Sequence, residues 1–169
     1  DKYMKNTDSF EHLDSYSSLV LHYGEIALKR GNRSRFEQML AENVAVKLGG
    51  TGFLKVRRLS GRIIVDYPQG TSLKDPILRV GGTFGVANVR PVVRVASCVE
   101  QIEAQALALL AGRKFASFAV RTKRGEKQFP LNSDEVNRRV GAAVVKASGA
   151  KVDLTKPELT LGIEILNKE

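Results

Sequence analysis

The chain has 169 residues and a formal net charge of +9, with 27 Lys and Arg against 18 Asp and Glu. Apolar residues make up 43% of the sequence, which is typical of a folded chain, and the length allows one ordinary domain or two small ones. No segment approaches the ~18 consecutive apolar residues of a membrane span, so we expect no membrane association and a cytoplasmic location. One cysteine and two histidines exclude an internal disulfide and argue against a metal site. The surplus of basic residues favours a polyanionic partner.

The first predicted elements are a strand and a helix. Residues 18–23 are apolar and β-prone, which predicts a strand. Over residues 33–48 an apolar side chain recurs every fourth position, which predicts an amphipathic helix. Asn32 or Ser34 can cap this helix, and the spacing of Ser34 and Glu37 predicts a capping box.

The pattern then predicts two strands joined by a three-residue turn, a short helix that ends at paired glycines, and a strand of alternating character. The order β-α-β-β-α-β is that of a ferredoxin-like domain. We therefore expect residues 18–95 to form an α+β domain of this kind. Residues 1–17 show no apolar period and are predicted to be a polar arm that need not be ordered. The further elements of the ferredoxin-like domain are expected over residues 53–58, 62–67, 72–80 and 85–95.

The pattern restarts near residue 96, which predicts a second, small α/β domain over residues 96–169. Its elements follow the order α-β-α-β-β, with a basic loop over 123–131 between the first strand and the second helix. Asn132 or Ser133 can cap that second helix, and an ion pair between residues 135 and 139 is expected on its outer side. The elements of this domain are expected over residues 99–110, 115–122, 132–147, 151–154 and 159–166.

Motifs of catalysis are missing from these residues. There is no phosphate-binding G-x-x-x-x-G-K-[ST] loop, no G-x-G-x-x-G after a strand and no G-x-S-x-G elbow. The segment Gly82-Thr-Phe-Gly85 matches the G-x-x-G loop that clamps nucleic acid in KH domains, but its place before a strand favours a helix C-cap. We therefore expect no cofactor to bind these residues.

Two basic segments are candidates for binding phosphate. Arg33 and Arg35 fall in the first turn of a predicted helix, where the helix dipole disfavours cations unless an anion binds there. The alternative is that their aliphatic stems only cover apolar surface. Arg121 and Lys123 lie on the same side of a predicted strand, and a basic loop follows it. Phe129 in this loop could stack on a base, although an aromatic residue before a proline more often fills a core. The candidate phosphate-binding residues are Lys29, Arg30, Arg33, Arg35, Arg121, Lys123, Arg124 and Lys127.

Residues 22–36, with the sequence HYGEIALKRGNRSRF, resemble the N-terminal signature of the tRNA 4-thiouridine synthetase family, also called tRNA sulfurtransferases. Segment 83–86 is similar to the F-G-I segment that follows it. Segments 118–124 and 151–157, FAVRTKR and KVDLTKP, resemble the THUMP domain of that family, an RNA-binding module. The resemblance implies a ferredoxin-like domain followed by a THUMP domain. The chain departs from the family in lacking the S-G-G-x-D-S loop of its ATP pyrophosphatase domain and the persulfide cysteine of a rhodanese-like domain.

The resemblance implies that the chain binds tRNA and positions the acceptor stem and its 3′ end for 4-thiouridine formation by a catalytic domain absent from these residues. ATP and Mg²⁺ would then serve the missing domain, a sulfur-donor protein would act through it, and a homodimer is possible. It also implies that the cations between residues 29 and 35 hold backbone phosphates, whereas those between 121 and 127 grip the 3′ end or the stem.

Two alternatives remain open. The chain could be the RNA-binding part of another THUMP-containing enzyme that modifies tRNA, such as a methyltransferase. It could also be a regulatory ferredoxin-like module that binds a small metabolite, which would require a ligand pocket and no contribution from the basic clusters.

Overall fold

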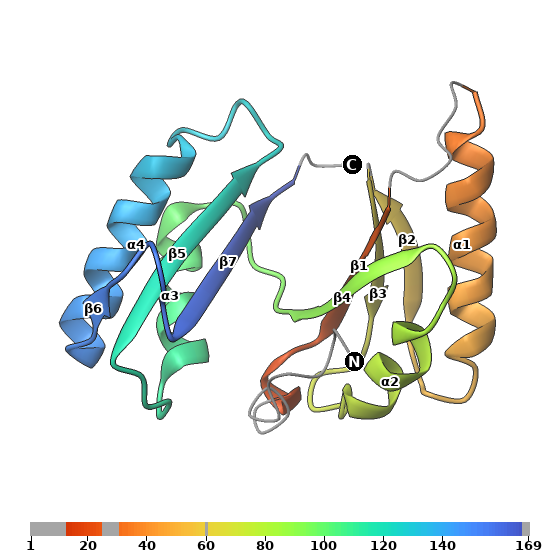
Figure 1. Ribbon diagram of the computed structural model, residues 1–169, viewed down its shortest axis with the longest axis horizontal. Helices are drawn as coiled ribbons and strands as arrows, with labels where there is room; N and C mark the ends of the chain where they lie inside the picture. The colour runs from red at the N-terminus through yellow and green to blue at the C-terminus, as the bar shows by residue number, and fades with distance from the viewer. Residues whose placement is uncertain (1–12, 25–30, 60, 167–169) are drawn as a thin grey trace. The chain divides into compact units, whose positions relative to one another are not determined.

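The computed structural model describes residues 13–24, 31–59 and 61–166 (Figure 1). The chain divides into two compact units, Asp1–Arg94 and Val95–Glu169. The division falls next to the boundary predicted from the restart of the apolar pattern. Each unit has its own hydrophobic core and is described by itself.

The first unit is a four-stranded sheet of order β2-β3-β1-β4 in which all neighbouring strands run antiparallel. Both helices cover one face of this sheet (Figure 1). This arrangement confirms the predicted ferredoxin-like fold. The elements, after a short 3-10 turn at Leu13–Ser15, are β1 Ser18–Tyr23, α1 Arg33–Lys47, β2 Lys55–Leu59, β3 Arg62–Asp66, α2 Lys74–Gly81 and β4 Val86–Val92.

The core of the first unit follows from the period of two along its central strands. Leu19 and Leu21 of β1 lie on the face that α1 covers, and they are fully buried together with Val65 of β3. Leu40 and Val44, one turn apart on α1, pack against them. Each of these side chains contributes about 1.5–3 kcal/mol by leaving water, which fixes the helix against the sheet.

The start of α1 differs from the prediction. Asn32 is the N-cap residue, but its backbone is helical, with φ −97° and ψ −3°, and its side chain makes no capping hydrogen bond. Ser34 lies inside the helix, and the carboxylate of Glu37 accepts hydrogen bonds from Tyr23 and Arg33. The predicted Ser34–Glu37 capping box is therefore wrong, because stronger donors occupy the carboxylate.

The β2–β3 turn is also tighter than predicted. Leu59 pairs with Arg62, so two residues connect the strands where three were expected. Gly61 has φ +78°, a conformation that glycine adopts without steric cost. The sequence therefore predicted the position of the hairpin correctly, but the predicted turn is one residue too long.

The second unit is a three-stranded parallel sheet of order β6-β5-β7, with α3 and α4 on one side of it (Figure 1). Phe118 and Val120 of β5 pack on Val136 and Val140 of α4, and Ile165 of β7 completes the cluster. The elements are α3 Val99–Leu110, β5 Ser117–Arg124, α4 Ser133–Ser148, β6 Lys151–Val152 and β7 Leu159–Ile165.

Two details of the second unit correct the prediction. The strand β5 continues to Arg124, so the basic loop is shorter than expected. Asn132 caps α4 as predicted, and Glu135 completes a capping box with it. Because Glu135 is used there, Arg139 pairs with two carboxylates of α3, Glu100 at 3.3 Å and Glu103 at 3.0 Å. The expected pair between residues 135 and 139 is replaced by a link between the two helices.

Candidate nucleic-acid interface

The structure describes six of the eight candidate phosphate-binding residues. Lys29 and Arg30 lie outside the described residues. Arg33 and Arg35 lie in the first turn of α1, in the first unit, and the remaining four lie in the second unit. The two groups are therefore described as separate sites.

The side chain of Arg33 is held in place by its own helix. Its Nε donates to Glu37 Oε1 at 2.8 Å, and the hydroxyl of Tyr23 donates to the same oxygen. Burial would raise the pKa of Glu37, but the two hydrogen bonds and the charge of Arg33 outweigh it and leave that pKa lowered. Burial raises the pKa of Tyr23, and Glu37 raises it further. Arg35 is exposed and forms no hydrogen bond or ion pair with other described residues, so its charge is open to an incoming anion.

A third arginine reaches the start of α1 from the sheet. Arg58 of β2 donates from Nη1 to the carbonyl oxygen of Ser34 at 3.3 Å. Gly61, in the β2–β3 turn, lies against the same place, since a Cβ built on it would be 3.5 Å from Arg33 Nη2. We call Arg33, Arg35 and Arg58 the α1 arginine cluster. Sequence reasoning missed Arg58 because only the packing of β2 against α1 brings it there.

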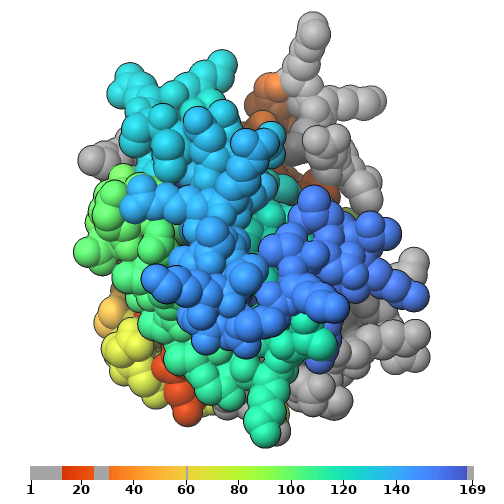
Figure 2. Space-filling view, turned by 90° about the vertical axis from the view of Figure 1, so that its left-hand side faces the viewer, coloured from red at the N-terminus to blue at the C-terminus, as the bar shows by residue number. Residues whose placement is uncertain are grey.

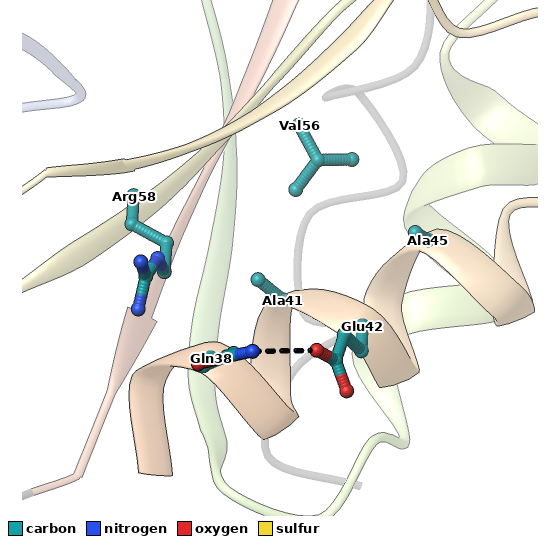
Figure 3. Close-up of a pocket in the computed structure, with 6 residues that line it drawn as sticks. All are labelled: Gln38, Ala41, Glu42, Ala45, Val56 and Arg58. Atoms are coloured by element: carbon teal, nitrogen blue, oxygen red, sulfur yellow. Dashed lines mark hydrogen bonds between the residues drawn. The ribbon is translucent and has the colours of Figure 1, made fainter. Parts of the chain in front are cut away.

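A hollow of about 370 Å³ lies between α1 and β2 (Figure 3). Gln38 and Glu42 at its rim are exposed, and Gln38 Nε2 donates to Glu42 Oε1 at 3.1 Å. Because its rim is open to solvent and carries a carboxylate, the hollow is a poor enclosed site for a metabolite. Its lining residues are Gln38, Ala41, Glu42, Ala45, Val56 and Arg58.

The sheet face away from the helices carries further cations, one of which is neutralised within the unit. Arg57 donates to both carboxylate oxygens of Asp66, at 2.9 and 3.1 Å, and Ser18 Oγ donates to Oδ1 at 2.8 Å. Burial would raise the pKa of Asp66, but these hydrogen bonds and the charges of Arg57 and Arg94 lower it. Arg57 therefore holds β2 against β3.

In the second unit, Arg121 and Lys123 point away from the core, because Phe118 and Val120 occupy the other face of β5. Arg121 Nη2 donates to the carbonyl oxygen of Leu154 at 3.1 Å, which fixes its position. Lys123 is exposed and makes no hydrogen bond or ion pair with other described residues. This face of β5 therefore presents one anchored and one unpaired cation.

The turn after β5 brings Arg124 and Lys127 to the same end of the sheet. Arg124 Nη1 donates to the carbonyl oxygens of Phe129 at 3.4 Å and Leu131 at 3.2 Å, so it holds the turn together. Lys127 is exposed and has no such partner among the described residues. Figure 2 shows the segment around 125–130, in cyan, projecting from the upper edge of this unit. Phe129 is only 5% exposed and belongs to the core, which is the role that the following proline favoured, so its ring does not present a face for stacking.

The basic stretch of sequence around β5 is split by the strand. Arg113 and Lys114 precede β5, whereas Lys127 follows it. A strand of 8 residues at about 3.3 Å per residue is about 26 Å long. Only the cations at the carboxyl end of β5, Arg121, Lys123, Arg124 and Lys127, can therefore act at one site, which we call the β5 cation site.

The described part of the chain offers neither a membrane-spanning helix nor a metal site. None of its helices is both long enough and apolar enough to cross a membrane. The same residues contain no group of three or more His, Cys, Asp or Glu side chains arranged to hold a metal ion.

Comparison with known families assigns both units. Residues 18–89 match the model of the ThiI ferredoxin-like domain, and residues 96–169 match that of the THUMP domain. Probable tRNA sulfurtransferases of Thermoanaerobacter sp. (strain X514) and Clostridium acetobutylicum are each 38% identical to the chain, over 148 and 151 residues. These alignments cover 87% and 89% of this chain and 38% of each relative, so the chain spans about two-fifths of their length.

Two solved structures are similar to the chain. PH1313 from Pyrococcus horikoshii Ot3 has a TM-score of 0.78 and 30% identity, over 89% of this chain and 51% of that one. A 4-thiouridine synthetase, solved as an RNA complex with bound ATP, has a TM-score of 0.73 and 27% identity, over 88% of this chain and 38% of that one. With both domain models matched in this order, the chain belongs to the ferredoxin-like plus THUMP region of the tRNA 4-thiouridine synthetase, or tRNA sulfurtransferase, family.

Proposed function

We propose that the chain binds tRNA and positions its acceptor stem and 3′ end for 4-thiouridine formation by a catalytic domain outside these residues. The observation that carries the proposal is the THUMP match over residues 96–169, in a unit whose β5 cation site carries exposed cations. The similar 4-thiouridine synthetase that was solved with RNA supports it. The ThiI ferredoxin-like match favours this family over a THUMP-containing methyltransferase.

The β5 cation site has the chemistry that folded RNA requires. Proteins recognise such RNA mainly through phosphates, 2′-hydroxyls and single-stranded ends. Lys123 and Lys127 offer unpaired charges, while hydrogen bonds to carbonyl oxygens fix Arg121 and Arg124. The site also lies outside the carboxyl ends of parallel strands, which is where open α/β sheets bind ligands.

We assign different parts of the RNA to the two units. The α1 arginine cluster, with Lys29 and Arg30, would hold phosphates of duplex backbone. The β5 cation site would grip the 3′ end or the adjoining stem. ATP, Mg²⁺ and a sulfur-donor protein would serve the catalytic domain, and the reaction would take place in the cytoplasm. A homodimer is compatible with this assignment of RNA parts to the two units.

The salt dependence of tRNA binding tests the proposal. If about five phosphates are neutralised, the logarithm of the association constant should fall with the logarithm of salt concentration with a slope of about −3.5 to −4.5. A gel-shift series from low to physiological salt measures this slope. Binding that does not respond to salt, or no binding at low salt, would contradict the proposed function.

Replacing Lys123 and Lys127 together with alanine tests the site. The double variant should weaken binding by roughly 1–2 kcal/mol and flatten the slope by about one to two, because each phosphate contact contributes close to one. The loss should shrink on tRNA trimmed of its single-stranded 3′ end. Lys114 and Lys151, exposed near the opposite end of β5, supply the control double variant with the same change in charge. Equal losses for both double variants would show that the charges act only as a diffuse field.

A further inference from the structure

Phe84 is the single aromatic residue among the described residues that lies exposed on the surface. Its exposed fraction is 94%, whereas Phe118, Phe129 and Tyr67 are buried and the remaining described aromatic residues are at least half-covered. Phe84 belongs to the G-x-x-G segment between α2 and β4. Because Phe129 fills a core, Phe84 is the described residue best placed to stack on a base.

The backbone holds Phe84 in this exposed position. The amide of Val86 donates to the carbonyl oxygen of Thr83 at 3.0 Å, and Gly85 has φ +92°, which together resemble a type II turn with Phe84 at its second position. The amide of Thr83 donates to Val80 at 3.0 Å, which ties the turn to the end of α2. Two hydrogen bonds thus flank Phe84, so its exposure is a property of an ordered turn.

The turn is also backed by the core. A Cβ built on Gly85 would lie 3.1 Å from Phe36 Cζ, so the turn packs closely on that ring. Phe36 in turn meets Tyr23 edge to face, with ring centroids 5.8 Å apart. The support beneath Phe84 is therefore made of residues that cannot easily move, which favours a preorganised contact.

The ring of Phe84 is open to solvent, as its exposed fraction of 94% shows. The chain before it is also uncrowded, since a Cβ built on Gly81 or Gly82 would meet nothing within 4 Å. No acidic residue lies between residues 76 and 99, and residues 18–97 carry thirteen basic against five acidic residues. A planar group attached to a polyanion can therefore approach the ring without steric hindrance or repulsion from a nearby carboxylate in the sequence.

We propose that Phe84 stacks on an unpaired base of the bound RNA. The inference rests on the proposed function and adds a contact that does not depend on charge. A single exposed ring is about the size of one base, whereas a stable protein partner would bury about 800 Å² on each side. Base–aromatic stacking tolerates any base, so the contact would select unpaired nucleotides by their accessibility.

A tryptophan at this position reports stacking directly, because the chain has no tryptophan of its own. In the full chain, Phe84→Trp should give fluorescence that tRNA quenches to saturation, since a stacked base quenches indole emission. The matched control is Leu54→Trp, at a position of the same unit that is 67% exposed. Weak and equal quenching of both variants would overturn the proposal.

Two further substitutions separate the aromatic face from mere apolar contact. Phe84→Leu should weaken tRNA binding by about 5-fold to 150-fold, the range expected for one stacked base, whereas Phe84→Tyr should stay within about 2-fold of the wild type. The salt slope should not change, because no phosphate contact is lost. If wild-type chain binds tRNA and Phe84→Leu binds equally well, the stacking inference fails while the proposed function stands. If the wild type does not bind tRNA at low salt, both fail.

Discussion

Asp66 accepts hydrogen bonds from two neighbouring strands of the first unit. Ser18 of β1 and Arg57 of β2 both donate to its carboxylate, and Arg94 lies 3.7 Å away. Burial acts to raise the pKa of Asp66, but the donors and positive charges lower it on balance. A single ionised side chain thus links three strands, which makes this part of the sheet sensitive to acid.

Replacing Asp66 with asparagine should lower the free energy of unfolding at pH 7 by about 1 kcal/mol, less than for a fully buried pair because solvent reaches the side chains. The folded-state pKa lies below the ordinary value, so the contribution is complete above that value and is lost as the pH falls through the lowered pKa. Urea unfolding at pH 7, and at the lowest pH at which the wild type still folds, measures the difference.

The penalty should therefore shrink in acid. Asp75→Asn is the control, because Asp75 forms an exposed ion pair with Arg79 at 2.8 Å that contributes only a few tenths of a kcal/mol. A penalty for Asp66→Asn that is equal at both pH values would contradict the linkage.

Individual side chains were the hardest features to predict from the sequence. The period of β5 correctly placed Arg121 on the face opposite Phe118, because alternation is a property of the strand itself. The proline after Phe129 favoured a buried ring, but the sequence could not show that Arg124 donates to carbonyl oxygens, because those bonds depend on how the following turn folds back. A local pattern predicts the face of a strand on which a side chain lies, whereas the hydrogen-bond partner of that side chain depends on the tertiary structure.

At the scale of elements, the starts of α1 and α4 show why a capping motif is not sufficient. Asn132 has φ −77° and ψ 171°, an extended backbone that lets its side chain accept the amide hydrogen of Glu135 at 2.9 Å. Asn32 occupies the same position in α1, but its helical backbone makes no such bond. Both N-cap residues are asparagine, so it is the backbone conformation at this position that decides whether the side chain can cap the helix.

Asn132→Ala should therefore destabilise the second unit by about 1 kcal/mol, because it removes the acceptor for an otherwise unpaired helix amide. Asn32→Ala is the matched control and should change the stability of the first unit by less than ~0.5 kcal/mol. Thermal unfolding of both variants, followed by circular dichroism, checks the difference. Equal losses would show that the hydrogen bond contributes nothing beyond residue preference.

The elements themselves were largely predictable. The helix Val99–Leu110 has the predicted ends, and the order of strands and helices in both units follows from apolar periods of two and four. The start of β2 was predicted two residues too early, and the β2–β3 turn was one residue too long, because pairing with β3 sets both limits. Register depends on partner strands, which a local pattern does not contain.

At the scale of the whole molecule, the two units have separate hydrophobic cores. Val44 is fully buried in the first core and Val140 in the second, and no residue belongs to both clusters of described residues. The restart of the apolar pattern near residue 96 predicted this division. Arg33 and Arg35 of the α1 arginine cluster were predicted, but Arg58 was not, because it reaches the helix from a separate strand.

Val44→Ala should lower the stability of the first unit by about 2 kcal/mol, and Val140→Ala should do the same in the second, because each removes methyl groups from a packed core. Native-state hydrogen exchange, read separately for amides of β1 and of β5, measures the effect on each unit. Each variant should increase exchange in its own unit and serve as the control for the other. Equal acceleration in both units after either change would show that they unfold together.

The parallel sheet of the second unit has a consequence for how the protein is made. Its central strand, β5, is completed by β6 and β7, both of which are synthesised after α4, and Ile165 of β7 belongs to the core. The first unit, by contrast, has all of its strands once Val92 has left the ribosome. At 5–20 residues per second, about 4 to 15 seconds separate these two events. From the completion of α4 at Ser148 until β7 follows, the growing chain displays the apolar side of β5 and its helices without their last partner, so a chaperone that works on nascent chains would find this unit still incomplete after the first unit has all of its strands.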